Sequence, residues 1–377
     1  MAMKVKKIHL ATLSDIHLGD RRNSASEIIA NLRRAIDDNT ETSQLDIIFL
    51  AGDVFDDLLV LSNDDVIEID LWIYWLITLC AKHDIVLRIL EGTPRHDRTQ
   101  SKRFLLVNEL MGYPADVKYM DKISIEHIER FGIDVLYIPD EATASPELTL
   151  KQVKEMMKAK ALTQVDFAIM HGMFEYQVPI ISKDHKHSSS EYLALVRYLI
   201  FIGHVHTFTQ LDRITAQGSF DRTAHGQEEA KGHVRATVYE SGEWEVVFVE
   251  NKGAKKFVTV RCQTSTLEET LVEINDVVQT LPKGSHIRLD LDRDHPLNAS
   301  TDVLIRTFPM ISWEKTIRGT DEEIAISDIV EPDEDYTPIT ITRENIVELL
   351  MKRLEYNETM TDELLEIARA HLQEVVK

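Results

Sequence analysis

Leu13-Ser14-Asp15-Ile16-His17 gives the first indication of the fold, because it reads as a buried strand that runs out into an Asp-x-His pair. Four later stretches repeat this arrangement, in which an apolar, β-branched run ends at Asp or His. They are Ala51-Gly52-Asp53, Gly92-Thr93-Pro94-Arg95-His96-Asp97, Met170-His171-Gly172 and Gly203-His204-Val205-His206. In open α/β sheets, ligands bind outside the carboxyl ends of the strands. The five stretches therefore predict one ligand-binding edge of an α/β protein.

The composition is that of an ordinary globular protein with an acidic balance. Of the 377 residues, 44% are hydrophobic and 28% are charged, and the formal net charge is -22. This charge argues against a protein that coats DNA through Lys and Arg. Bound metal ions could still hold nucleic acid locally, because a dication is often the largest charge in a site. The longest apolar run, residues 71–81, is shorter than the roughly 20 residues that span a membrane, so we expect no membrane partner.

The cysteines and the N-terminus favour a cytoplasmic protein. Cys80 and Cys262 both lie in apolar runs, so we expect reduced core thiols and no disulfide framework. The lysines near the N-terminus resemble the start of a signal peptide, but Asp15 and His17 interrupt the apolar run behind them. No small-residue cleavage site follows, and we therefore expect no export.

The order of the expected elements is that of a layered α/β protein. Residues 7–12 and 45–51 read as buried strands, and residues 24–37 between them have helical spacing, which predicts parallel pairing through a crossover. Alternating runs on either side of a Glu-Ser-Gly-Glu turn predict a hairpin. The other expected strands are 85–90, 135–138, 167–170 and 199–202, the other helices are 102–111 and 150–160, and the hairpin strands are 236–239 and 244–249. We therefore expect layered β-sheets that are flanked by helices and finish with antiparallel strands.

Residues 64–82 predict a helix that is apolar on nearly every side. Such a helix is buried on more than one face. One face can cover the sheet. The other face either meets a second subunit or belongs to an entirely intramolecular core, and the sequence favours neither.

A domain boundary is expected near residues 251–253. Residues 1–252 would form the core domain, and residues 253–335 a small α+β capping unit, in which strands 257–261 and 287–291 flank helix 267–281. Residues 331–335 read as a solvated acidic linker. Residues 336–377 contain two helical patterns whose apolar stripes need a partner surface. They would form either a folded cap or a docking surface for another protein.

The side chains at the five strand ends are suited to binding metal ions. Imidazoles combined with hard carboxylates suit manganese, iron or zinc, and the absence of cysteine argues against a structural zinc site. Two carboxylates and several neutral imidazoles can hold two dications roughly 3.5 to 4 Å apart, bridged by one carboxylate and a water. Such a pair lowers the pKa of the bridging water and stabilises both oxygens of a phosphoryl transfer. The expected reaction is phosphoester hydrolysis.

Taken in order, the five stretches resemble the calcineurin-like metallophosphoesterase family. They cover residues 9–206 as Asp-x-His, Gly-Asp, a Gly-x-His-Asp-like loop, a lone His after a strand, and Gly-His-x-His. Within that family the chain is similar to the SbcD-type DNA nucleases and their phage recombination counterparts. Three features carry this finer resemblance: Gly52-Asp53-Val54-Phe55-Asp56, the segment 217–232, and the small C-terminal unit with its helices.

The resemblance implies the ligands of two divalent metal ions, which would be Mn²⁺. Asp53 would bridge the two ions. One ion would be bound by Asp15, His17 and His206, and the other by His171 and His204.

The loop that carries His96 departs from the family pattern. The resemblance implies that His96 protonates the leaving oxygen or stabilises charge on the phosphate, and that Asp97 orients it. The family has Asn, a ligand of the second ion, directly before this histidine, but the loop here reads Thr93-Pro94-Arg95-His96. Either Thr93 or a backbone carbonyl replaces the amide, or His96 is itself a ligand, or the second ion binds weakly. Arg95 could instead contact the phosphate bidentately.

Two residues of the segment after the last motif, Arg222 and His225, are further candidates for substrate contact. His185 and His187 form another His-x-His, but they lie among Lys, Asp and Ser residues. We interpret them as part of a solvated loop.

We expect a manganese-dependent DNA nuclease, exonuclease or endonuclease, that hydrolyses phosphodiester bonds in recombination and repair. It would act as a homodimer whose contact includes the helix 64–82. The resemblance implies an SMC-like ATPase partner of the SbcC type. The sequence contains no Gly-x-x-x-x-Gly-Lys-Ser/Thr phosphate loop of its own, so ATP dependence would come from that partner.

Two other functions remain open from the sequence. A phosphatase or cyclic-nucleotide phosphodiesterase would use the same metal ions on a small substrate. A non-catalytic scaffold would bind DNA or the ATPase with one metal position left empty by the altered Thr93–Asp97 loop.

Overall fold

The computed structural model describes residues 7–59, 65–112, 115–178, 185–262 and 266–318, together with the backbone of residues 323–325. Its centre is a pair of six-stranded sheets. The first sheet has the order β14-β13-β1-β2-β3-β4. Its strands are β1 Ile8–Leu13, β2 Ile47–Ala51, β3 Val86–Leu90, β4 Val117–Met120, β13 Gly232–Val238 and β14 Trp244–Glu250.

The second sheet has the order β11-β12-β10-β7-β6-β5. Its strands are β5 Ser124–Ile128, β6 Ile133–Ile138, β7 Val165–His171, β10 Val196–Gly203, β11 Thr209–Leu211 and β12 Ile214–Ala216. A two-stranded ladder of β8 (Met173–Phe174) and β9 (Lys186–His187) lies beyond the end of β7.

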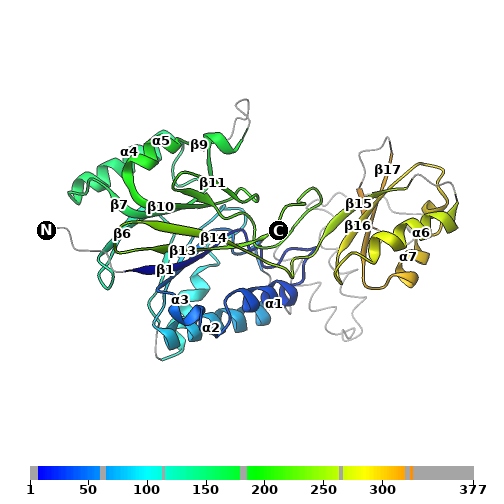
Figure 1. The fold of residues 1–377 in the computed structure, drawn as a ribbon, viewed down its shortest axis with the longest axis horizontal. Coiled ribbons are helices and arrows are strands. Elements are labelled where there is room, and N and C mark those ends of the chain that lie inside the picture. Colours follow the sequence, from blue (N-terminus) through cyan, green and yellow to red (C-terminus); the bar gives the residue numbers. More distant parts are fainter. Residues whose placement is uncertain are drawn as a thin grey trace, which may run out of the picture. The chain divides into compact units, whose positions relative to one another are not determined.

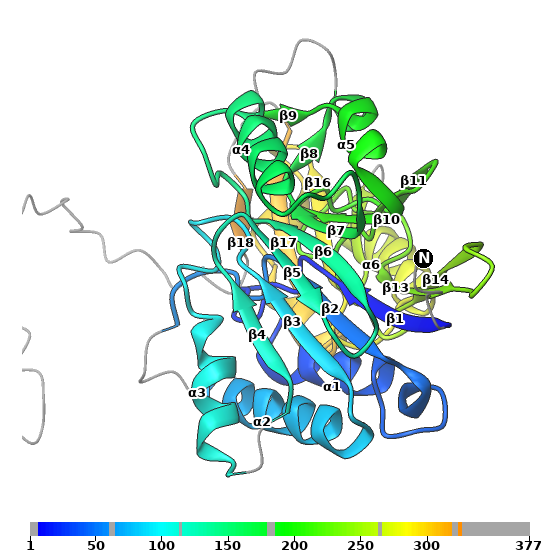
Figure 2. The ribbon, with the colours of Figure 1, turned by 90° about the vertical axis from the view of Figure 1, so that its left-hand side faces the viewer.

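Helices cover the outer face of each sheet (Figures 1 and 2). One group is α1 Ala25–Ala35, α2 Asp65–His83 and α3 Lys102–Leu110, and the other is α4 Pro146–Ala159 and α5 Ser189–Leu195. Short 3₁₀ helices are η1 Thr42–Gln44, η2 Glu175–Gln177 and η3 Pro296–Asn298. Figure 2 shows the two groups of helices on opposite sides of the paired sheets. The predicted layered α/β fold is confirmed.

Three apolar clusters fill the spaces between these layers. In β2, Ile48 and Leu50 pack toward α1 and α2, whereas Ile47 and Phe49 pack toward the second sheet. A third cluster joins the outer face of the second sheet to α4 and α5. Strands buried on both faces are apolar throughout, which explains the unbroken apolar runs in the sequence.

Most predicted elements of residues 7–250 are present. β1 and β2 are parallel across the α1 crossover, and β13 and β14 form the predicted antiparallel hairpin. The helix expected from residue 150 begins earlier, at Pro146, because the side chain of Ser145 caps it and proline suits the first helical turn. Strands β4, β5, β11 and β12 were not predicted from the sequence. β4 is only partly buried, so its apolar pattern is weak.

Both cysteine side chains are buried, as predicted. Burial raises the pKa of the Cys80 thiol to about 12 and that of Cys262 to about 11. No helix in the described part of the chain is long and apolar enough to cross a membrane.

Helix α2 buries one face and exposes another. Ile69, Trp72 and Ile73 belong to the core beneath the first sheet. Ile67 is 64% exposed and Leu71 is 57% exposed on the opposite side. Within one chain, therefore, the apolar residues of α2 are not all covered.

Four strands between residues 257 and 325 form a further sheet, in the order β15-β16-β17-β18. The elements are β15 Phe257–Arg261, α6 Leu267–Val278, β16 His286–Leu291, α7 Asp302–Thr307, β17 Ser312–Ile317 and β18 Glu323–Ala325. The first three strands are parallel, and their apolar face packs with α6 and α7 around a core of its own. The helices expected within 336–377 lie outside the described residues.

Candidate metal centre

The five predicted strand ends meet at one edge of the paired sheets. Asp15 follows β1, Asp53 follows β2, His171 ends β7, and His204 follows β10. A hydrogen bond of 2.8 Å joins the Nδ1 atom of His171 to the carbonyl of Ala51 at the end of β2, so the two sheets touch here. The predicted ligand-binding edge is therefore formed by both sheets.

The backbone turns sharply at these ends. Asp15, His17, Asp53 and His204 all have positive φ, at 50°, 54°, 50° and 95°. Such conformations are uncommon for residues other than glycine and cluster at functional sites. At Gly203 a Cβ atom would lie only 2.8 Å from His171 Nδ1, so a residue with a side chain does not fit.

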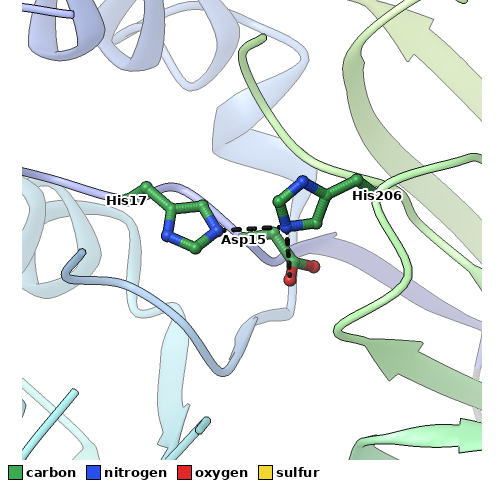
Figure 3. Close-up of side chains that lie close together, drawn as sticks. All are labelled: Asp15, His17 and His206. Atoms are coloured by element: carbon green, nitrogen blue, oxygen red, sulfur yellow. Dashed lines mark hydrogen bonds and ion pairs between the residues drawn. The ribbon is translucent and has the colours of Figure 1, made fainter. Parts of the chain in front are cut away.

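The first cluster consists of Asp15, His17 and His206. The Nε2 atoms of His17 and His206 lie 3.2 Å apart, and His206 Nε2 is 3.7 Å from an oxygen of Asp15. Figure 3 shows the two rings facing each other with the carboxylate beside them. Three donor atoms thus converge on one point.

The second cluster consists of Asp53, His171 and His204. The Nε2 atom of His171 lies 3.3 Å from an oxygen of Asp53. The hydroxyl of Thr93 is 3.4 Å from Nδ1 of His204 and 3.5 Å from Nε2 of His171, and it donates to Asp53 at 3.1 Å. Among the alternatives for this loop, the geometry places the Thr93 hydroxyl at the second cluster.

Asp53 also belongs to a third group, with His17 and His96. Its carboxylate therefore lies between the first cluster and the second. The amide of Thr93 donates to Asp53 Oδ1 at 2.6 Å, which fixes the carboxylate in this place. Asp53 is therefore the one carboxylate that candidate ligand groups on both sides share among the described residues, with His17 on one side and His171 on the other.

Hydrogen bonds to the outer ring nitrogens direct two imidazoles toward the centre. His171 Nδ1 contacts the Ala51 carbonyl, and His17 Nδ1 lies 3.1 Å from an oxygen of Asp56. Each acceptor favours a proton on Nδ1, which leaves the Nε2 lone pair facing inward. This is the usual arrangement of metal-binding histidines.

The carboxylates and imidazoles at the centre shift one another's pKa values. Burial alone would raise the pKa of Asp53, but His171 and His17 hold it well below its usual value. Burial alone would lower the pKa of His171, but the charge of Asp53 and the contact with it raise that pKa well above normal. In His206, burial lowers the pKa and favours the neutral imidazole. Buried carboxylates and imidazoles arranged in this way fit divalent metal ions.

Gln227 lies behind His206 and was missed by the sequence analysis. Its side-chain amide is 2.9 Å from His206 Nδ1, and its carbonyl oxygen accepts from the backbone amide of Thr223. The glutamine therefore holds the His206 ring from the side opposite Asp15. Asp56 was quoted only as part of a motif, and its contact with His17 was not foreseen.

His96 lies at the edge of the site. Its ring centroid is 5.1 Å from that of His17, and its Nδ1 atom contacts the carbonyl of Asp56 at 2.5 Å. The nearest carboxylate oxygen of Asp56 is 3.9 Å from the same nitrogen. The residue that orients His96 is therefore Asp56.

The predicted role of Asp97 is not supported. Its carboxylate accepts hydrogen bonds from the backbone amides of Asp53, Phe55 and Gly92, at 2.7 to 3.1 Å. The side chain is fully buried, and burial together with the charge of Asp53 raises its pKa to about 7. Asp97 ties the loop after β2 to the loop after β3 and so positions Asp53.

Arg222 does not project toward a substrate as expected. Its buried guanidinium donates to the carbonyls of Gln227, Glu229 and Lys255, at 2.7 to 3.1 Å. It holds the loop that carries Gln227 against the chain leading to β15. A single buried guanidinium can satisfy several carbonyls of an irregular loop because it has five N–H donors.

His225 also lies away from the predicted substrate position. Its Nε2 atom is 3.5 Å from Glu314 on β17, and its ring meets Phe257 edge-on. His187 is buried beside Phe174 and Tyr192, and burial lowers its pKa to about 4, so the solvated-loop interpretation is wrong for this residue. Arg95, by contrast, is exposed, and its guanidinium has no hydrogen bond or ion pair to another described residue.

Comparisons with known proteins add little to this geometry. No family model and no curated protein matches the chain. Among solved structures, TT1561 of Thermus thermophilus is 8% identical, with a TM-score of 0.35 over 64% of this chain and 98% of that one. GAP50, the anchor in the inner membrane complex of Plasmodium, is 15% identical, with a TM-score of 0.39 over 77% of this chain and 99% of that one. Neither likeness is close enough to assign a family or an activity.

Proposed function

We propose that the protein is a manganese-dependent DNA nuclease of the calcineurin-like metallophosphoesterase type, similar to the SbcD nucleases of recombination and repair. The observation that carries the proposal is the place of Asp53. Its carboxylate is shared between a cluster with His171 and His204 and a group with His17 and His96. A shared carboxylate between two sets of ligands is the arrangement of a two-metal site.

The residues fit the ions that this function needs. Oxygen donors from Asp15 and Asp53 combine with nitrogen donors from four histidines, a mixture that suits manganese or iron better than calcium. When bound, two dications would lower the pKa of a water and stabilise the attacking and leaving oxygens of a phosphodiester. The chain supplies the geometry for both positions.

The site is accessible from one side. Asp15, Asp53 and His171 are buried and form its floor. The side chains of His96, His204 and His206 are 22%, 31% and 28% exposed and form its rim. A phosphodiester would therefore approach between His96 and His204.

His96 would serve as the proton donor to the leaving oxygen. Its Nδ1–H is held by the carbonyl of Asp56, so Nε2 is the nitrogen left for the substrate. The Asp56 carboxylate, 3.9 Å from Nδ1, lies on the same side of the ring as this carbonyl. Arg95, exposed on the same loop, would pair with a flanking phosphate.

Cleavage of a labelled linear duplex tests the proposal, alongside a small chromogenic phosphodiester, with Mn²⁺ and with EDTA. The wild type should cut the duplex only with metal. His96→Ala should reduce the rate about 10²- to 10⁴-fold, the usual contribution of a general acid, without loss of metal binding. Asp53→Asn should abolish the reaction, and Asp57→Asn, at an exposed neighbouring position, should leave it unchanged.

Two outcomes would replace the proposal with another function. Hydrolysis of the small ester alone would indicate a phosphatase or phosphodiesterase. If neither substrate is cut, even with an SbcC-type ATPase added, the protein is a non-catalytic scaffold that binds DNA or the ATPase. The proposal includes the SbcC-type ATPase as a partner. The segment expected to dock it, residues 336–377, lies outside the described residues.

A homodimer is also proposed. Exposed apolar side chains on α2 and α3 surround a groove of about 360 Å³, lined by Ile67, Asp70, Leu71, Tyr74, Val107, Leu110 and Met111. The two helices pack together through Trp72 and Phe104, whose rings are 6.0 Å apart. A second copy of the same two helices would cover this face by forming a four-helix contact. Exposed apolar patches of this kind mark interaction sites.

A further inference from the structure

The two clusters differ in how many carboxylates belong to one cluster alone. The first cluster has the carboxylate of Asp15, and its His17 also groups with Asp53. The second has only the shared carboxylate, two imidazoles and the hydroxyl of Thr93. A neutral hydroxyl is a weak ligand for a hard dication, which prefers carboxylate oxygen. The second position therefore lacks a carboxylate of its own.

Asp140 is placed to supply this charge. It follows β6, which ends at Ile138 and pairs in parallel with β7, so Asp140 lies at the same sheet edge as His171. Its Oδ2 atom is 3.9 Å from Nδ1 of His204, and its side chain is 17% exposed. The same His204 nitrogen faces the Thr93 hydroxyl at 3.4 Å.

These distances agree with binding to one ion. Donors about 2.1 Å from the same ion lie at most about 4.2 Å apart. The separation of 3.9 Å between Asp140 Oδ2 and His204 Nδ1 falls within this limit. The other oxygen, Oδ1, accepts the amide of Glu141 at 3.0 Å, which leaves Oδ2 for the side of His204.

Gly172 lies beside the carboxylate of Asp140. It directly follows His171 and has a φ of +132°, which side-chain-bearing residues rarely adopt. A Cβ atom at this position would lie 3.4 Å from Asp140 Oδ1. The residue that follows His171 is therefore in direct reach of the Asp140 carboxylate, which places this carboxylate next to the second cluster.

An ordinary cap of the loop after β6 would explain the bond from Glu141 to Oδ1. It would not explain why the free oxygen is directed at His204, in a part of the chain where other residues converge as ligands. We propose that Asp140 is the carboxylate of the second metal position, bound to the ion directly or through a coordinated water. This inference rests on the proposed two-metal site, and it adds a ligand that no sequence motif contains.

The test measures Mn²⁺ binding to the metal-free full-length protein by calorimetry, with free Mn²⁺ followed by its EPR signal. The wild type should bind two ions. Asp140→Asn keeps the shape of the side chain and removes its charge, so it should retain one ion at wild-type affinity and weaken the other about 10-fold or more. Glu141→Gln changes the net charge by the same amount next door and should bind both ions normally.

A double variant locates the affected ion. Asp15→Asn should weaken the first position, so Asp15→Asn with Asp140→Asn should bind no ion at wild-type affinity. The inference is overturned if Asp140→Asn binds both ions like the wild type, or if Glu141→Gln has an equal effect. The wild type could bind two ions and yet cut no phosphodiester. If Asp140→Asn then loses the second ion, this inference holds and the proposed nuclease activity is wrong.

Discussion

The Nε2 atoms of His17 and His206 lie 3.2 Å apart, although 189 residues separate the two histidines in the chain. Asp56 takes the outer nitrogen of His17, and Gln227 contacts the outer nitrogen of His206. The Nε2 lone pairs of the two rings repel each other at this distance unless a proton or a metal cation lies between them. The metal-binding function proposed for this edge of the sheets starts from this pair.

Asp56 should control the affinity of the first metal position. Asp56→Asn removes the charge that holds the Nδ1 proton of His17, so Mn²⁺ should bind there about 10- to 100-fold more weakly. Calorimetric titration of the metal-free protein measures this. Asp57→Asn is the matched control, since Asp57 pairs with Arg98 on the surface. Equal affinities in the wild type and Asp56→Asn would show that the contact with His17 has no role in metal binding.

Arg95 and Arg222 should respond in opposite ways to substitution. Arg95→Ala removes an exposed cation, so it should weaken DNA binding and lower the slope of log affinity against log salt by about 1, without changing stability. Arg222→Ala leaves buried carbonyls without donors and should destabilise the protein by about 1 to 3 kcal/mol. Urea unfolding and DNA titration at several salt concentrations separate the two. A large stability loss in Arg95→Ala would contradict these roles.

His233, the second residue of β13, should make the protein sensitive to acid. Its side chain is buried, and burial together with the charge of Arg235 lowers its pKa to about 3. Between this value and the ordinary histidine pKa near 6.5, the unfolded chain binds a proton that the folded chain does not. The neutral His233 ring therefore makes its full contribution to the free energy of unfolding above about pH 6.5. This contribution is lost as the pH falls below that value.

The expected size of this effect can be measured. Between pH 7.5 and pH 5, the loss of unfolding free energy should be about 2 kcal/mol smaller in His233→Gln than in the wild type. Urea unfolding of the metal-free protein gives both values. His127→Gln, at a half-exposed position, is the control. An identical loss in the wild type and His233→Gln would contradict a buried neutral His233.

The proposed dimer depends on α2 and α3. Leu71→Glu introduces a charge into their shared exposed apolar face, so it should convert a dimer into a monomer in analytical ultracentrifugation. Leu148 on α4 is similarly exposed, at 50%, and Leu148→Glu should leave the mass unchanged. A wild type that sediments as a monomer at all concentrations would rule the dimer out.

The candidate metal ligands could be found in the sequence because each of them closes an apolar run. β1, β2, β7 and β10 are buried on both faces, and a polar residue at the end of such a strand stands out. The position of that residue in space then follows from parallel pairing. The same reasoning could not identify Asp140, which follows β6 without a neighbouring histidine, or Gln227, which lies in an irregular loop.

The errors in the predicted roles have a different cause. Asp97 was expected to orient His96 because the family resemblance implies that role, but its carboxylate is directed into the interior and meets three backbone amides. Arg222 was a candidate for substrate contact because it lies in the segment after the last motif, yet its partners are carbonyls of its own loop and of the segment before β15. The partner of a buried polar group depends on chain segments far away in sequence, which local patterns do not contain.

Anomalous diffraction from crystals soaked in Mn²⁺ would locate the metal ions at this edge of the sheets. Two peaks are expected, roughly 3.5 to 4 Å apart, with Asp53 between them. One peak should contact the Nε2 atoms of His17 and His206, and the other Nε2 of His171 and Nδ1 of His204. A map without peaks among these side chains, or with a single peak, would contradict a two-metal site.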